Sequence, residues 1–459
     1  MTTSSARAAW LTLLRRFHFY IGLFVGPFIF IAALSGTLYV ATPQLENHLY
    51  ASALYSSAQG EAQPLARQVA VAQQATEGAL RLYAVRPAPK PGETTRVMFA
   101  DPALGPSESR AIFIDPVTLA VKGDMTVYGT SGILPLRQWI DYLHRSLLLG
   151  DAGRLYSELA ASWMWVAALG GILLWWLTRP KRQPRAAKTN RFVSARRWHI
   201  TLGWLLLAGL LLFSATGLTW SQWAGANVDK MRAAFGWLTP QVSTALVAAK
   251  AMPADPHAEH HMHHEHMTMT PPQTDPSLLD AVLGVARRAG IDAAKVEIRP
   301  PRQAQQAWTV TEVDRGWPTQ VDAVAIDGER LKVVDEARFE SFPLLAKLTR
   351  WGVDFHMGIL FGLPNQLLLI AFGAGLCVSI IMGYRLWWLR RPTGAQTNPA
   401  ATLCGAWLSL SGAGRAGTLV IALLLGCALP VMGVSLVLFF VTDMLRWQGE
   451  KRRLSVVNR

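Results

Sequence analysis

Residues 15–40 read RRFHFYIGLFVGPFIFIAALSGTLYV: two arginines, a histidine and then an apolar run that continues to Val40. A helix rises about 1.5 Å per residue, so this run is long enough to cross about 30 Å of hydrocarbon. A similar opening, RRWHITLG, begins at Arg196 and leads into another apolar run. The sequence therefore predicts a membrane protein in which one kind of spanning segment occurs twice.

The composition agrees with a membrane protein. Hydrophobic residues make up 51% of the 459 residues and charged residues only 16%, whereas soluble proteins carry roughly 25% charge. Five apolar runs are long enough to span a bilayer, near 17–41, 156–178, 198–222, 363–389 and 417–443. The first run is longer than the apolar part of a secretory signal, so we interpret it as a retained anchor.

The net charge of +14 has a distribution that argues against nucleic-acid binding. Eight Lys and Arg residues and no acid lie between Arg179 and Arg197, between two apolar runs. Short loops of this kind are cytoplasmic under the positive-inside rule. We therefore expect a multi-pass membrane protein with no nucleic-acid partner, whose large loops lie on the outer face.

This orientation divides the chain into alternating membrane and outer parts. The predicted parts are 1–41 (N-terminus and first span), 42–155 (first outer domain), 156–222 (second and third spans with the basic loop), 223–362 (second outer domain), 363–392 (fourth span) and 393–459 (linker, fifth apolar span and basic tail). The fifth run breaks the rule, because its basic tail would lie outside. Pro430 lies in its middle, so a kinked span and a re-entrant hairpin both stay open, and we prefer the single span.

The chain repeats itself without gaps at two different offsets. At the first offset, the segment from Arg15 to Gly22 matches that from Arg196 to Gly203. At the second offset, which is larger, His144 matches His356, and the Trp-Trp pair at 175–176 matches that at 387–388. We predict a four-helix transmembrane core built from two parallel repeats, related by an axis along the membrane normal. The difference between the offsets indicates an insert in the second outer domain, near 252–276.

The outer domains have the pattern of small α+β domains. In the second, helical periodicity over 277–289 ends at Gly290, and strand-like segments follow at 294–299, 307–312, 319–326 and 331–334. The first shows strand-like segments at 81–86, 95–100 and 110–114.

Four of the eleven histidines are repeat-related and lie at predicted membrane boundaries: His18 and His199 inside, His144 and His356 outside. Ionisable residues at such depths are costly and usually functional. The repeat axis brings His18 towards His199 and His144 towards His356, and two facing imidazoles make a bis-histidine haem site. Interfacial histidines bonded to headgroups are the alternative. None of the three cysteines forms a C-x-x-C-H motif, so any haem would be b-type.

Three segments resemble the PepSY-associated transmembrane family, some of whose members are bacterial inner-membrane ferrisiderophore reductases. They are residues 15–40, the segment FPLLAKLTRWGVDFHMGILFGLPNQ at 342–366 and YRLWWLRRP at 384–392. The resemblance implies PepSY-type periplasmic domains and two haems held by the four histidines. Met357 departs from relatives, which often carry an acid after the histidine.

The expected function is that of a di-haem b-type reductase, which passes electrons across the lipid bilayer from an unidentified donor to a ferric siderophore or other iron chelate. A non-catalytic accessory protein that binds siderophore, metal or an envelope partner is the alternative. A transporter should show broken helices with polar residues at mid-membrane, and spans one to four carry almost no polar residues there. A transition metal could bind loosely to the insert through its histidines, with no fixed geometry: His257, His260, His261, His263, His264 and His266.

Overall fold

The computed structural model describes all residues except 1–2, 179–190, 247–274, 391–401 and 458–459. The chain forms two compact units, and each takes residues from several parts of the sequence. The first, called here the membrane unit, comprises 1–39, 141–234 and 367–459; the second, called the sheet unit, comprises 40–140 and 235–366.

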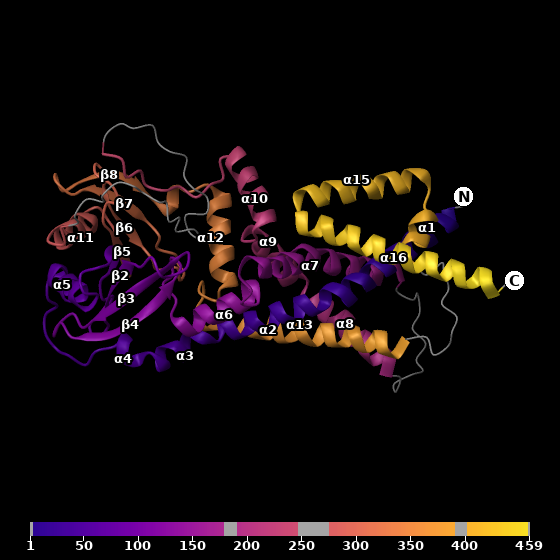
Figure 1. Ribbon diagram of the computed structural model, residues 1–459, viewed down its shortest axis with the longest axis horizontal. Coiled ribbons are helices and arrows are strands. Elements are labelled where there is room, and N and C mark those ends of the chain that lie inside the picture. The colour runs from indigo at the N-terminus through magenta and orange to yellow at the C-terminus, as the bar shows by residue number, and fades with distance from the viewer. Residues whose placement is uncertain (1–2, 179–190, 247–274, 391–401, 458–459) are drawn as a thin grey trace. The chain divides into compact units, whose positions relative to one another are not determined.

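The membrane unit is entirely helical in its described residues (Figure 1). Its elements are α1 (Thr3–Tyr20), η1 (Ile21–Val25), α2 (Gly26–Val40), α7 (Gly150–Thr178), α8 (Arg191–Leu205), α9 (Leu207–Thr219), α10 (Trp223–Ala234), α13 (Leu363–Arg390), α14 (Leu403–Leu408), α15 (Gly412–Ala428) and α16 (Pro430–Val457). Four helices are long and apolar enough to cross a membrane, at Arg7–Val40, Gly150–Thr178, Leu363–Arg390 and Pro430–Gly449. The pair α8 and α9 makes a fifth candidate, bent by 59°.

The first span contains a π-turn with an identifiable cause. The N–H of Gly26 donates to the carbonyl of Ile21, five residues earlier. Pro27 has no N–H to offer the carbonyl of Leu23. The hydroxyl of Tyr384 on α13 donates to that carbonyl instead, at 2.9 Å. The irregular turn therefore fastens α13 to the first span.

The fifth apolar run does not form one continuous helix, in contrast to the preferred prediction of a single span through it. It divides at Leu429 into α15 and α16, which lie side by side as a hairpin (Figure 1). A methyl group on Gly426 would lie 3.2 Å from the Cα of Gly433, so glycine permits the tight fold-back. Pro430 begins α16, where its missing N–H leaves no hydrogen bond unmade.

The hairpin returns the chain to the end of the membrane unit where it starts. Gly414, at the beginning of α15, lies against Trp10. On α16 the carboxylate of Asp443 accepts a hydrogen bond from the hydroxyl of Tyr20, and Arg446 donates to the same hydroxyl at 3.2 Å. The C-terminal basic segment is therefore part of α16, and Arg446 lies beside the end of α1.

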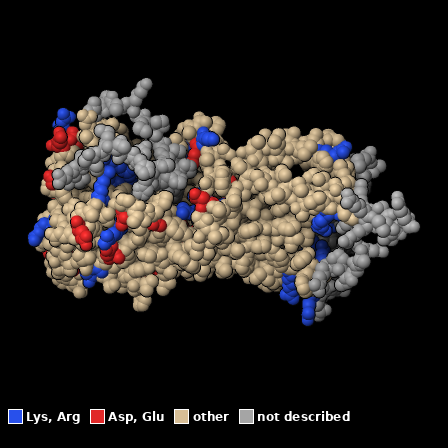
Figure 2. Space-filling model, viewed as in Figure 1, with Lys and Arg blue, Asp and Glu red and all other residues tan. Residues whose placement is uncertain are grey.

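The lipid-facing character of this unit is visible on its surface. On the face shown in Figure 2, the described residues of α15 and α16 carry no charged side chains along most of their length, with basic residues near the chain termini. Leu419, Leu423 and Val434 are each more than half exposed. An apolar belt of this kind suits hydrocarbon rather than water.

The sheet unit contains one continuous antiparallel sheet of eight strands, in the order β4-β3-β2-β1-β5-β6-β7-β8. The strands are β1 (Arg81–Arg86), β2 (Thr95–Ala100), β3 (Glu108–Ile114), β4 (Val121–Tyr128), β5 (Val296–Arg299), β6 (Trp308–Glu312), β7 (Ala323–Asp327) and β8 (Lys332–Ala337). The two predicted outer domains are therefore not separate: β1 pairs with β5 in antiparallel fashion, with Val85 opposite Ile298. Edge-to-edge pairing removes two exposed strand edges, which would otherwise invite aggregation.

The helices of the sheet unit are α3 (Thr42–Leu49), α4 (Ala51–Leu54), α5 (Leu65–Ala75), α6 (Pro135–Ser146), α11 (Leu278–Arg288) and α12 (Leu344–His356), together with the short η2 (Phe339–Ser341); the last residues of α6 belong to the membrane unit. Helices α5 and α11 cover one face of the sheet, and their apolar side chains share one core with both halves of it. Val69, Val282 and Ile298 are fully buried there.

The predicted strands 81–86 and 95–100 coincide with β1 and β2, and the predicted helix 277–289 agrees with α11 to within a residue at each end. Strand β4 was not predicted, because Lys122, Gly123 and Asp124 interrupt its apolar alternation.

Candidate functional site

The structure brings the imidazoles of His18 and His199 together in the membrane unit. Their ring centroids lie 6.3 Å apart, with an angle of 66° between the ring planes. His18 lies near the end of α1 and His199 in the middle of α8.

The hydrogen bond of His199 determines which of its ring nitrogens is free. Its Nδ1 lies 2.9 Å from the backbone carbonyl of Ser379, an oxygen that can only accept. Nδ1 therefore carries the proton, and Nε2 keeps a lone pair that can bind a metal. Ala167, which occupies the position of Ser379 in the first repeat, presents its carbonyl towards His18. The geometry there falls short of a hydrogen bond, so the buried Nδ1 of His18 has no partner.

A glycine lies against each imidazole of this pair. A methyl group on Gly171 would lie 3.0 Å from Cε1 of His18, and one on Gly383 would lie 3.5 Å from Cε1 of His199. Four residues after each histidine, on the same side of its helix, Gly22 and Gly203 have open space where a side chain would be. The pair is thus packed closely on one side and left open one helical turn away.

His144, the third histidine of the membrane unit, lies at the opposite end of the first span. Its Nδ1 is 3.0 Å from the hydroxyl of Ser35, which itself donates to the carbonyl of Ile31 at 2.7 Å. Since the hydroxyl proton of Ser35 is used in that way, Ser35 accepts from Nδ1–H, and the lone pair of the ring is on Nε2. Seventeen residues, roughly 25 Å of helix, separate Ser35 from His18.

His356 is the last residue of α12, in the sheet unit. Two residues earlier, the fully buried Asp354 forms ion pairs with Arg315 and Arg350. A terminal nitrogen of Arg315 also lies 3.6 Å from the sulfur of Met357, the position at which the sequence departs from the family pattern. The carboxylate of Asp354 thus anchors both arginines beside His356.

The predicted partners His144 and His356 belong to different compact units, so their pairing stays a prediction. The six histidines of the insert lie outside the described residues. Within those that are described, no three His, Cys, Asp or Glu side chains form a group that could hold a metal ion.

A break in the helical structure lies between His144 and the span that follows it, and another between His356 and its span. Gly150 begins α7 and Gly362 immediately precedes α13, and both have a φ of +59°, a left-handed conformation that favours glycine. Gly153 and Pro364 do not break their helices. Gly153 lies in the first turn of α7, where any side chain would overlap the carbonyl of Ser146.

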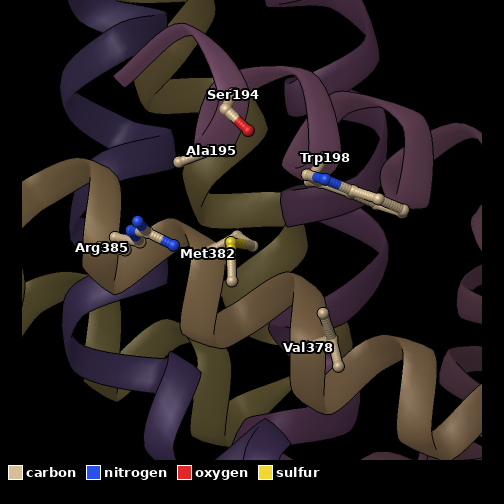
Figure 3. Close-up of a pocket in the computed structure, with 6 residues that line it drawn as sticks. All are labelled: Ser194, Ala195, Trp198, Val378, Met382 and Arg385. Atoms are coloured by element: carbon tan, nitrogen blue, oxygen red, sulfur yellow. The ribbon is translucent and has the colours of Figure 1, made fainter. Parts of the chain in front are cut away.

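A pocket of ≈ 250 Å³ lies between α8 and α13, close to His199 in sequence. Figure 3 shows Val378, Met382 and Arg385 on α13 facing the residues of α8. From α8 it is lined by Ser194, Ala195 and Trp198. Its lining is mixed, with one guanidinium, one hydroxyl and several apolar groups.

Residues 15–390 match the family described as PepSY-associated TM region. The chain belongs to this family. The resemblance inferred from the sequence is therefore confirmed, and the matching segment of this PepSY-associated protein contains all four repeat-related histidines. It ends before α14 and the C-terminal hairpin. No curated protein matches the chain significantly.

Sequence reasoning missed the glycines around the inner pair. Gly171 and Gly383 are related by the same sequence offset as His144 and His356, which already related the spans of this PepSY-associated protein. Applying that offset to every glycine would have found them. Gly22 and Gly203 were visible as parts of the repeated motif, but only the structure shows the space beside them.

Proposed function

We propose that the protein is a di-haem b-type reductase of the bacterial inner membrane, which passes electrons outwards to reduce a ferric siderophore or similar iron chelate in the periplasm. The observation that carries the proposal is the facing pair His18 and His199, with a ring-centroid distance of 6.3 Å. Bound haem would supply one-electron redox chemistry at this place.

The inner pair fits a single iron atom between two imidazoles. A histidine nitrogen lies about 2 Å from a bound metal ion, so two opposite imidazoles have ring centroids roughly 6 Å apart. The observed 6.3 Å agrees with that spacing. The open space at Gly22 and Gly203 is where a flat macrocycle could lie beside the two rings.

Hydrogen bonds within the protein orient the histidines that would bind the haem iron. The carbonyl of Ser379 fixes the ring of His199 and directs its Nε2 away from the backbone. Hydrogen bonds of this kind orient metal-binding histidines and raise their basicity. Ser35 does the same for His144. Near the inner pair, Arg15, Arg196 and Arg390 lie close enough to repel one another, a positive environment suited to haem propionates.

A second haem held by His144 and His356 is supported by the similarity of the two halves. Each half contains a helix, a four-stranded antiparallel segment, a histidine-bearing helix, a left-handed glycine and a span, in that order. The sheet order reads the same from either edge, since equivalent strands β1 and β5 pair at its centre. Both features support two parallel repeats.

Outward placement of the sheet unit is supported by the positive-inside rule. The basic loop 179–197 and the basic C-terminal segment then share the cytoplasmic side with the N-terminus. A chelate too polar for the bilayer would meet the protein at its periplasmic part. Reduction releases iron because Fe(II) binds hard oxygen chelators less tightly than Fe(III) does.

The bend in the third span does not favour a transporter. It occurs at Leu206, and the flanking Leu205 is 75% exposed. Leucine side chains offer no ligands for a polar substrate, whereas broken transporter helices place polar groups at the break.

Spectroscopy of the purified protein tests the proposal. We expect a dithionite-reducible b-type spectrum with two haems per chain. His18→Ala and His199→Ala should remove the same haem, and His144→Ala and His356→Ala the other. In right-side-out proteoliposomes, external ferric chelate should reoxidise the haem that His356→Ala removes. Protein without haem after haem-supplemented expression would instead support the non-catalytic accessory.

A further inference from the structure

Three arginines gather around Tyr83 at the centre of the eight-stranded sheet. The guanidinium carbons of Arg299 and Arg302 lie 5.1 Å and 6.0 Å from the centre of the Tyr83 ring. A terminal nitrogen of Arg81 donates to the backbone carbonyl of Arg302 at 3.1 Å. Arg81 and Tyr83 lie in β1, Arg299 is the last residue of β5, and Arg302 follows three residues later; β1 and β5 are the two strands that join the halves of the sheet.

The group lies on the sheet face opposite α5 and α11. Val296 and Ile298 point into the core under α5 and α11. Side chains alternate along a strand, so Glu297 and Arg299 point to the other face. Arg81 and Arg302 are exposed.

The arginines around Tyr83 carry more positive charge than nearby carboxylates neutralise. Among the residues that the structure describes, Glu297 is the one carboxylate that pairs with the group, and it is shared by Arg86 and Arg299 at 2.6 Å each. Four guanidinium groups and one carboxylate leave a net charge of +3. Within the described part of the chain, the guanidinium of Arg302 has no hydrogen-bond acceptor, and Arg299 uses only its Nε. Several donors are therefore available to a ligand.

Other surface arginines of the same sheet are neutralised. Arg110 pairs with Asp124 at 2.6 Å, and Arg338 pairs with Glu336 at 2.8 Å. Arg81 instead has Arg302 as its charged neighbour, and the partial burial of its side chain together with that neighbour lowers its pKa. Like charges held together without an acid are an arrangement that an anionic ligand would stabilise.

A continuous set of contacts connects this group to the helix that carries His356. Arg86, which holds Glu297, donates to the carbonyls of Thr130 and Ser131. The hydroxyl of Ser131 accepts a hydrogen bond from Arg315. Arg315 is paired with Asp354 on α12, two residues before His356. A ligand at Tyr83 would thus bind to a surface that is connected by hydrogen bonds and an ion pair to α12, the helix that carries His356.

We propose that Arg81, Arg299 and Arg302 around Tyr83 form a binding site for an anionic metal chelate, whose carboxylate or catecholate oxygens accept hydrogen bonds from the three guanidinium groups. The assignment of the ligand as an iron chelate rests on the proposed function. Guanidinium groups recognise such oxygens in pairs, and Tyr83 offers an aromatic edge for a catechol ring.

Binding of a redox-inert chelate tests the site separately from reduction. The probe is the trianionic tris-catecholate complex of Ga(III), which the protein cannot reduce, titrated calorimetrically into the full-length protein in nanodiscs. We expect the double variant Arg81→Ser/Arg302→Ser to bind it at least about tenfold more weakly. The matched control Arg67→Ser/Arg330→Ser also removes two exposed positive charges, and it should bind within about twofold of the unaltered protein.

Two further probes complete the test. The neutral tris-hydroxamate complex of Ga(III) should show no difference between the variants. Equal affinity of the tris-catecholate complex for the Arg81→Ser/Arg302→Ser variant and the unaltered protein would overturn the site. Inorganic phosphate that competes as well as the chelate would overturn the assignment to a chelate. Absence of haem would refute the reductase but leave these binding results interpretable.

Discussion

Gly150 and Gly362 have the same left-handed backbone conformation, with a φ of +59° in each. They are related by the same sequence offset as His144 and His356, and each lies between a helix that carries a histidine and the span that follows it. The two breaks are therefore made in the same way, although they belong to different compact units. Equivalent positions of the two sequence repeats therefore have the same backbone conformation.

Replacing either glycine by alanine should destabilise the protein. A non-glycine residue in the left-handed region costs roughly 1–2 kcal/mol. No atom lies within 4 Å of a methyl group at either position, so the conformation alone would cause the loss. Thermal unfolding should show a lower midpoint for Gly150→Ala and Gly362→Ala. Gly284→Ala, inside α11, is the control and should not lower it, because alanine is the better helix former. An unchanged midpoint in both variants would contradict the strain argument.

Gly171 and Gly170 provide a matched pair for the inner site. A methyl group on Gly171 would lie 3.0 Å from the ring of His18, whereas one on Gly170 would lie 3.8 Å or more from any atom. Gly171→Ala should therefore displace the imidazole and lower haem content severalfold or shift the spectrum of one haem. Gly170→Ala should leave both unchanged. Identical spectra for the two variants would show that His18 does not depend on this contact.

The C-terminal hairpin predicts that both chain ends lie on the same side of the membrane. A fluorescent protein fused after Arg459 should fluoresce, and alkaline phosphatase fused there should be inactive, as at a cytoplasmic terminus. Phosphatase inserted after Gly328, in the turn between β7 and β8, should be active and serves as the control. Active phosphatase at the C-terminus would restore the single-span interpretation.

Glu297 should make the stability of the sheet unit sensitive to acid. Burial opposes its charge, but the charges of Arg299 and Arg86 outweigh burial and hold its pKa at about 2. An unfolded glutamate has a pKa of about 4.3, so the stabilisation is complete above that pH and is lost as the pH falls towards 2.

Glu297→Gln should therefore reduce the free energy of unfolding by about 3 kcal/mol at pH 7. The difference from the unaltered protein should shrink between pH 4 and pH 3, as chemical unfolding would show. Glu329→Gln, at an exposed turn, should change stability by less than about 0.5 kcal/mol at either pH. If Glu297→Gln lowered the free energy of unfolding equally at all pH values, the loss would come from altered packing rather than from the lost charge.

Much of the fold could be predicted from periodicity and repetition. Apolar runs located the spans, and alternation located β1 and β2 to the residue. The joining of two domains into one sheet could not be predicted, because the pairing of Val85 with Ile298 depends on tertiary placement rather than on local pattern. Pro430 was compatible with a kink and with a turn, and the misplaced basic tail was the signal that should have favoured the turn.

The candidate site, like the fold, could be predicted only in part from the sequence. Repetition was sufficient to predict that His18 and His199 approach each other. It could not show that Ser379 fixes the ring of His199, since a backbone carbonyl has no sequence signature. Glycine occurs in proteins for many different structural reasons. The close contact of Gly383 with the ring of His199 could therefore not be predicted from the sequence.

The pairing of β1 with β5 has a consequence for chain continuity. Were the backbone cut between Thr178 and Arg191, one fragment would carry β1–β4 and the other β5–β8. The hydrogen bonds of the central strand pair would survive, as would the bond from Ser214 to the carbonyl of Ala161 that joins α9 to α7. Two such fragments, expressed as separate polypeptides, should purify as one complex. In this sense the single chain is a tethered heterodimer, held together more by its central strands than by its linker.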